Sequence, residues 1–213
     1  IVLKNLYENS YINKSEYENL ISKEIKTKKR KIKLLEEANF YSEEVRRIIT
    51  DIYGYDELYK GGLSIRTPLN SNYQIKALEA LREGLEKYDK RHGWRGPITN
   101  INSVDWQKDI KEFIFDKSLH WELAKVIDVN QLSLKIEIEN KEVGFIDFKN
   151  IKWTRKKSFE DFLKLNDIIY VQKIKKNKWS LKQLPKINGA IVVMDPYTGR
   201  VLAMVGGFSF KLS

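Results

Sequence analysis

The side chains that most often act in catalysis occur in this chain, but their spacing matches no common active-site arrangement. No serine is followed three positions later by a lysine, the spacing at which a lysine can activate a serine nucleophile. His92 and His120 stand far apart and outside any metal-ligand spacing. The neighbouring carboxylates Glu160 and Asp161 are typical of a solvated helix start. The sequence therefore predicts no catalytic residue, no bound cofactor and no metal site.

Binding remains open, because aromatic and basic residues are interleaved in the second half of the chain. Aromatic rings can stack on the bases of a single-stranded nucleic acid while lysine and arginine neutralise its phosphates. The candidate residues for such a surface are Trp121, Lys125, Lys135, Phe145, Lys149, Trp153, Arg155, Lys156 and Lys157. Most of these aromatic residues stand among apolar residues that suit a core, so this hypothesis ranks last.

Composition sets wider limits on the class of protein. The chain has 213 residues, of which 42% are hydrophobic, and this suffices for one large or two small domains. It contains no cysteine, which excludes disulfides and thiolate metal sites, and no apolar run long enough to span a bilayer. The net charge is +10, and the densest basic run covers residues 26–33. Such a run could bind an anionic polymer or membrane surface, but a solvated linker is the favoured interpretation.

The first 60 residues are expected to be helical. Either Asn13 with Glu16 or Ser15 with Glu18 has the spacing of a capping box, in which side chain and backbone bond reciprocally at a helix start.

Further helix and strand signals follow along the chain. Ser42, followed by two glutamates, is expected to cap a helix that ends at Gly54. Alternating apolar residues then predict a short strand over residues 63–67. Asn70 or Ser71 is expected to cap a long helix after it.

From about residue 97 to residue 185 the apolar period changes to two, which is typical of strands. Strands are expected over residues 123–129, 132–138, 143–148, 167–174 and 179–184. A short helix is expected where apolar residues recur at Phe159, Phe162, Leu163 and Leu165. Five short strands with one intervening helix predict a small closed or partly open barrel of the OB type. The expected fold class is therefore α+β.

The last segment of the chain predicts a β-hairpin. Apolar runs over residues 190–194 and 201–205 flank Asp195-Pro196 and Gly199, which are typical turn residues. The helix that follows Asn70 and the strand at 63–67 are expected to pack against this hairpin. Few residues follow it, so we expect that the rest of its cover belongs to a domain continuing beyond the given sequence.

Four segments of the chain carry a resemblance to a known family. The first is DPYTGRVLAMVGGFSF, residues 195–210, which is similar to the start of the transpeptidase domain of class A penicillin-binding proteins of the 1A subfamily. VLKNLYENSYINKSEYENL, residues 2–20, is similar to the end of the glycosyltransferase domain. EEVRRIITDIYGYDELYKGGLSIRTPLN and ALEALREGLEKYDKRHGWRGP, residues 43–70 and 77–97, are similar to the interdomain linker. The stretch after Pro97 takes the place of the family's OB-like insertion.

The resemblance implies a domain plan. It comprises residues 1–60 as the helical end of the glycosyltransferase domain, 61–96 as the linker, 97–185 as the OB-like barrel and 186–213 as the first hairpin of the transpeptidase domain. Members of the family are bifunctional peptidoglycan synthases of the bacterial inner membrane, with most of their mass in the periplasm. One domain polymerises lipid II with a glutamate base, and the other cross-links peptides through a serine that penicillins acylate.

Neither set of catalytic residues is expected in this chain. In the glycosyltransferase signature E-D-x-x-F-x-x-H, Lys164 and Asp167 would stand at the phenylalanine and histidine positions after Glu160 and Asp161. The transpeptidase serine is expected beyond Ser213. The resemblance thus implies the non-catalytic centre of a synthase, with the two catalytic domains of the same chain as its partners and the membrane reached only through the parent's anchor.

Three roles remain for this central part. The favoured one is structural, in which it sets the distance and angle between the two catalytic domains. The alternative is docking of a periplasmic activator or of peptidoglycan itself. The expected docking surface consists of Lys149, Lys152, Trp153, Arg155, Lys156 and Lys157. Nucleic-acid binding comes third, because the implied location makes such a ligand unexpected.

Overall fold

The computed structural model describes residues 1–23, 35–110 and 116–212. They belong to two compact units, Ile1–Leu34 and Leu35–Ser213. The basic run over residues 26–33 lies outside the described residues. Within the described ranges, no helix has the length and apolar character needed to cross a bilayer.

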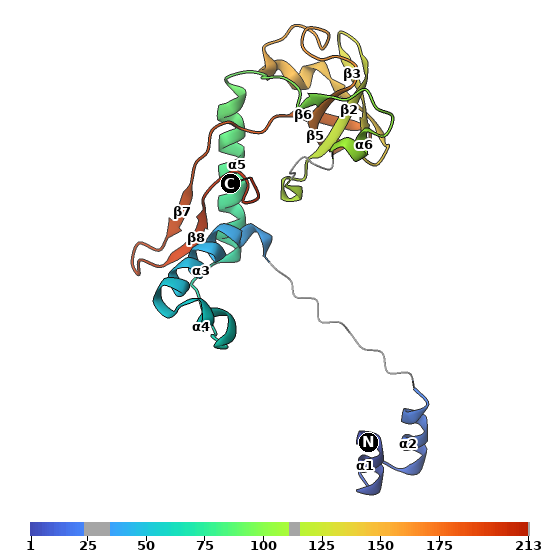
Figure 1. Ribbon diagram of the computed structural model, residues 1–213, viewed down its shortest axis with the longest axis vertical. Helices are drawn as coiled ribbons and strands as arrows, with labels where there is room; N and C mark the ends of the chain where they lie inside the picture. Colours follow the sequence, from blue (N-terminus) through green and yellow to red (C-terminus); the bar gives the residue numbers. More distant parts are fainter. Residues whose placement is uncertain (24–34, 111–115, 213) are drawn as a thin grey trace. The chain divides into compact units, whose positions relative to one another are not determined.

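The first unit contains two short helices. They are α1 (Val2–Glu8) and α2 (Lys14–Ile21) (Figure 1). The Asn13 side chain accepts a hydrogen bond from the Glu16 amide, and the Glu16 carboxylate accepts one from the Asn13 amide, each at 2.9 Å. This reciprocal pair confirms the first of the two predicted capping boxes. The rings of Tyr7 and Tyr17 stack between the helices, with their centroids 5.1 Å apart.

The second unit begins with helices onto which the C-terminal hairpin packs, and we call this assembly the platform. Its elements are η1 (Glu36–Ala38), α3 (Asn39–Tyr53), α4 (Tyr55–Lys60), α5 (Ser71–Lys90), β7 (Ile191–Met194) and β8 (Val201–Val205). Antiparallel pairing of β7 with β8 confirms the predicted hairpin, which runs beside α5 (Figure 1). The buried side chains between helix and hairpin are Ala77, Leu78, Leu81, Leu85, Ala203 and Val205.

The start of α3 differs from the expectation. The helix begins at Asn39, so Ser42 lies inside its first turn and the prediction that Ser42 caps it is wrong. The 3₁₀ turn η1 runs directly into α3 and already carries the chain into helical geometry, so no capping side chain is used. Gly54, with a φ of 84°, ends the helix as predicted.

The expected strand over residues 63–67 does not form. A strand needs a neighbour that completes its ladder of hydrogen bonds, and the side chain of Gln74 occupies the outer edge of β8. Its amide donates to the Met204 carbonyl and accepts from the Met204 N–H, both at 2.9 Å. Asn70 donates its N–H to Leu202 O at 2.9 Å, and its side chain caps α5 as predicted.

The rest of the second unit is a β-barrel with short helical segments. Its elements are β1 (Thr99–Asn100), α6 (Trp106–Asp109), η3 (Lys117–Leu119), β2 (Glu122–Val129), β3 (Ser133–Ile138), β4 (Val143–Asp147), η4 (Phe148–Thr154), β5 (Asp167–Lys175) and β6 (Lys178–Lys182). The strands follow the order β5-β2-β3-β4-β6, and β6 pairs with β5 to close the barrel. Only the β4–β6 pair among these barrel neighbours is parallel. The predicted OB-like α+β fold is therefore confirmed.

Alternate residues of the strands fill the barrel. Leu134, Ile136 and Ile138 of β3 are fully buried, as is Trp179 of β6. Trp179 closes the barrel at the parallel seam, where its indole ring lies over the backbone of Gly144. A Cβ atom on Gly144 would stand 2.2 Å from Trp179 Nε1, so only glycine leaves room for the ring.

The expected helix over residues 159–165 is reduced to a single turn. The Leu163 N–H bonds the Phe159 carbonyl at 3.0 Å, and both side chains are buried beneath the barrel. The Asp161 carboxylate caps the turn by accepting from the backbone amides of Lys157 and Ser158. Leu165 is exposed, so a helix continued to this residue would bury no further apolar side chain there. The longer helical segment is η4, which precedes this turn.

Candidate functional site

Asp89 lies in the last turn of α5, close to the two connections between α5, the barrel and the hairpin. Its carboxylate accepts hydrogen bonds from Arg95 Nη1 at 2.8 Å, from Gln183 Nε2 at 2.8 Å and from the Lys186 N–H at 3.1 Å. Arg95 lies on the connection that enters the barrel, and Gln183 and Lys186 lie on the connection that leaves it. One carboxylate, only 3% exposed, thus holds both connections at the end of α5.

A second contact joins the barrel wall to α5 one turn earlier. Glu86 accepts a hydrogen bond from Lys182 Nζ of β6 at 2.6 Å. The same ammonium group lies 5.1 Å from the ring centroid of Trp121, which is buried and packs against Phe208 beyond β8. The barrel is therefore fixed to the platform by packing as well as by charge.

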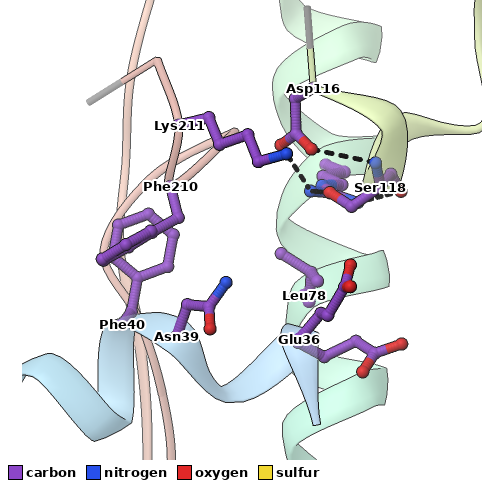
Figure 2. Close-up of a pocket in the computed structure, with 10 residues that line it drawn as sticks. Glu36, Asn39, Phe40, Leu78, Asp116, Ser118, Phe210 and Lys211 are labelled. Atoms are coloured by element: carbon purple, nitrogen blue, oxygen red, sulfur yellow. Dashed lines mark hydrogen bonds and ion pairs between the residues drawn. The ribbon is translucent and has the colours of Figure 1, made fainter. Parts of the chain in front are cut away.

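The third contact is a polar network around Arg82 of α5. Its guanidinium group donates to the Phe208 carbonyl at 2.9 Å, to the Ser118 carbonyl at 2.9 Å and to Ser118 Oγ at 2.8 Å. Asp116 lies 3.7 Å from the same group and accepts hydrogen bonds from the Ser118 N–H and from Ser209 Oγ. Figure 2 shows Asp116 and Ser118 beside the helix that carries Leu78. We call the contacts of Arg82, Glu86 and Asp89 together the barrel mount.

The residues of the predicted docking surface lie close together in η4 and the segment after it. Lys149, Lys152, Arg155, Lys156 and Lys157 are exposed, whereas Trp153 is half-buried. The Trp153 ring packs edge-on against Trp94, with the centroids 5.9 Å apart, and the Arg155 guanidinium group donates to the Arg91 carbonyl. Within the described residues, none of the four lysines forms an ion pair with a carboxylate. Whether this surface docks a partner stays a prediction.

The structure does not bring the nine nucleic-acid candidates into one surface. Trp121 is buried between barrel and platform, and Lys125 is buried with its Nζ donating to Ser103 O at 2.9 Å. Lys135 and Phe145 lie on another part of the barrel, in β3 and β4. Neither Trp121 nor Lys125 is therefore available to a ligand.

Comparison with known proteins places this geometry in a family. Residues 94–187 match the family described as "Penicillin-binding protein OB-like domain". The whole chain is 38% identical over 216 residues to penicillin-binding protein 1A of Rickettsia typhi. The chain belongs to the class A penicillin-binding proteins. It is also 27% identical over 231 residues to penicillin-binding protein 1A of Vibrio cholerae, covering 99% of this chain.

A solved structure agrees with this membership in class A. The crystal structure of penicillin-binding protein 1A from Haemophilus influenzae matches all of this chain with a TM-score of 0.68 and 26% identity. The chain covers 31% of that structure, 27% of the Rickettsia typhi protein and 28% of the Vibrio cholerae protein. It therefore spans less than a third of each relative.

The residues of the barrel mount are not among the sequence-based candidates for this class A protein, although a signal for them exists. Leu78, Leu81 and Leu85 form the apolar stripe of α5, and Gln74 and Asp89 lie on the same face at its two ends. Polar residues on a buried stripe need buried hydrogen-bond partners. That requirement marks both positions as structural contact points, but the sequence does not show which residues they contact.

The buried carboxyl groups of the barrel mount make the free energy of unfolding depend on pH. Burial disfavours the charged forms of Asp89 and Asp116, but hydrogen bonds outweigh this effect and lower the pKa of both carboxyl groups below the ordinary value of 3.8. A depressed pKa stabilises the fold fully above the unfolded-state value, and the stabilisation is lost as pH falls through the folded-state pKa. We therefore expect urea stability to fall steeply below about pH 4.

Substitution isolates this contribution. The Asp89→Asn/Asp116→Asn chain should show a smaller loss of unfolding free energy between pH 7 and pH 3 than the wild type, measured by urea titration with tryptophan fluorescence. The exposed carboxyl of Asp51 provides the control, and Asp51→Asn should behave as wild type. An acid response unchanged in the double variant would contradict this assignment.

Proposed function

We propose that this chain is the non-catalytic central part of a bifunctional peptidoglycan synthase and that it positions the two catalytic domains. In this proposal the parent polymerises glycan strands and cross-links their peptides, and this region lies in the periplasm on a parent held in the inner membrane. In the proposed domain plan, residues 1–60 form the end of the glycosyltransferase domain and residues 61–96 form the linker. Residues 97–185 form the OB-like barrel, and residues 186–213 form the first hairpin of the transpeptidase domain. Family membership supports this plan.

The observation that carries the positioning role is the set of hydrogen bonds made by Gln74. This residue is fully buried in the linker helix α5, and its Nε2 donates to Glu37 O at 2.8 Å and to Met204 O at 2.9 Å. Glu37 belongs to the proposed end of the first catalytic domain, and Met204 to the proposed start of the second. One side chain thus binds segments from both sides of the linker.

A second bond supports the same role. The hydroxyl of Tyr41 in α3 donates to the Val201 carbonyl of β8 at 2.9 Å. Buried hydrogen bonds of this kind fix orientation, because breaking one leaves an unsatisfied group away from water. The angle between the two catalytic domains would then follow from the packing of α3 and α5 on the hairpin.

The full-length parent tests the proposal through Gln74→Leu. We expect polymerisation of lipid II to continue, while peptide cross-linking per polymerised disaccharide falls by a factor of about 5 or more, since misalignment alone costs large factors in rate. Muropeptide analysis of the product measures both quantities. The matched control is Gln131→Leu, at an exposed position of a barrel loop. Cross-linking that matches the wild type in Gln74→Leu would contradict the positioning role.

A docking role for the barrel is the second candidate, and five exposed cations in residues 149–157 favour it. The partner would be a periplasmic activator or peptidoglycan. Capture of the chain on peptidoglycan or on a purified activator, and loss of that capture in Arg155→Glu/Lys156→Glu/Lys157→Glu, would support docking. Equal capture of the triple variant would exclude this surface.

A further inference from the structure

An exposed aromatic ring stands on the outer face of the barrel between two lysines. Phe145 of β4 is 43% exposed. In the strand register its neighbour on one side is Lys135 of β3, and its neighbour on the other side is Lys178 of β6. The residues beside them in sequence, among them Leu134, Ile146 and Trp179, point into the core. Lys135, Phe145 and Lys178 therefore share the outer face.

Positive charge continues around this ring. Glu137 lies two residues from Lys135 in β3, and its carboxylate accepts from Trp106 Nε1 at 2.8 Å. Asp147 binds Lys178 Nζ at 2.9 Å. That hydrogen bond lowers the pKa of Asp147, and the charges of Lys149 and Lys175 act on it in the same direction. In the part of the chain that the structure describes, Lys135, Lys149 and Lys175 form no ion pair. We call Lys135, Phe145, Lys149, Lys175 and Lys178 the lysine–phenylalanine face.

The position of this face within the fold favours a binding role. OB-type barrels bind oligosaccharides and oligonucleotides on the face of their second and third strands and on the loop between the fourth and fifth. In this barrel those strands are β3 and β4, and the loop is the turn after Lys175, where the Asn177 carbonyl accepts from the Phe145 N–H at 2.9 Å. The lysine–phenylalanine face coincides with that region.

The residues of the lysine–phenylalanine face favour one class of ligand. The flat side of an aromatic ring carries partial negative charge and attracts the C–H groups of a sugar ring, while lysines bind carboxylates. Single-stranded nucleic acid is bound by aromatic rings that stack on successive bases. Phe145 is the one strongly exposed aromatic ring on the described barrel strands, which favours a carboxylated sugar over a nucleic acid.

We propose that the lysine–phenylalanine face binds a glycan strand that bears carboxylates, with one sugar ring on Phe145 and its carboxylates on the surrounding lysines. This proposal rests on the proposed function, in which the parent polymerises glycan strands. The site differs from the docking surface of η4, which shares only Lys149 with it. Its role is to hold the strand along the barrel.

The test is fluorescence anisotropy of a labelled, peptide-free glycan of alternating N-acetylglucosamine and N-acetylmuramic acid, with the full chain. We expect salt-sensitive binding, and binding at least about tenfold weaker for Phe145→Ala and for Lys135→Glu/Lys149→Glu, since each tenfold step corresponds to about 1.4 kcal/mol. The matched control, Lys76→Glu/Lys164→Glu, changes the charge equally at exposed positions outside both surfaces and should bind as wild type. Circular dichroism checks that each variant is folded.

Comparison ligands make the proposal refutable. A chitin oligomer of equal length has the same backbone sugars without the lactyl carboxylates, and it should bind at least about tenfold more weakly. Equal binding of chitin, tighter binding of an oligothymidylate, equal loss in the control variant, or no glycan binding would each overturn the proposal. Its failure would leave the Gln74→Leu result intact, whereas unchanged cross-linking in Gln74→Leu with normal glycan binding would overturn only the positioning role.

Discussion

The Gly144→Ala chain is expected to lose about 3–5 kcal/mol of unfolding free energy, the range seen when a large aromatic residue loses its core packing. A Cβ atom at this position would stand 2.2 Å from Trp179 Nε1 and 2.3 Å from Trp179 Cδ1. The indole ring is fully buried and cannot move aside without leaving the core. Since Trp179 closes the parallel seam between β4 and β6, its displacement should open the barrel.

The same substitution elsewhere gives a matched control. Gly84 lies on the exposed side of α5, and nothing would contact a Cβ atom placed there within 4 Å. Gly84→Ala should therefore stabilise the chain by about 0.5–1 kcal/mol through helix propensity. Urea unfolding monitored by tryptophan fluorescence measures both variants. A Gly144→Ala chain as stable as the wild type would contradict the prediction, because it would show that a Cβ atom at this position does not displace Trp179 at a cost in stability.

The Arg82→Met chain is expected to lose about 3 kcal/mol, because removing one partner of a buried network leaves the others unsatisfied. The substitution deprives the Phe208 carbonyl, the Ser118 carbonyl and Ser118 Oγ of a donor. It also leaves the buried carboxylate of Asp116 without the positive charge of Arg82, which lies 3.7 Å away. Chemical denaturation measures the loss.

Two further variants separate the network from the general effect of removing an arginine. Arg47 forms an exposed ion pair with Glu44 within α3, and Arg47→Met should cost less than about 0.5 kcal/mol. Arg82→Met/Asp116→Asn removes the uncompensated charge, so the double variant should be more stable than Arg82→Met alone. A double variant that is less stable by the full sum of both single effects would contradict a coupled network.

Local pattern predicted the elements whose signals lie within a few neighbouring residues. Alternating apolar residues placed the five barrel strands within two residues of their observed ends, and the Asp195-Pro196 turn placed the hairpin. Asn13 and Asn70 cap their helices as the spacing indicated. These features depend on backbone preferences and one-sided burial, which a short stretch of sequence already contains.

The errors arise where a distant residue decides the local structure. The strand expected at 63–67 is absent because Gln74 occupies the edge of β8, and Ser42 is no cap because η1 precedes it. The site shows the same limit. Lys135 and Phe145 appeared among the nucleic-acid candidates, but the parallel seam that brings Lys178 beside Phe145 is a long-range pairing. Residue types suggested binding, and the topology decided which of them lie together.

The bonds of Asp89 have a mechanical consequence. They hold the segment before the barrel, at Arg95, and the segment after it, at Lys186, on the same carboxylate. The helix α5 and the strand β8 also pack directly on each other. A force that pulls on the platform is therefore transmitted directly from α5 to β8 and does not pass through the barrel. The barrel lies outside this direct contact between α5 and β8. Its size can therefore change over evolution without changing the length of the segment that transmits the force.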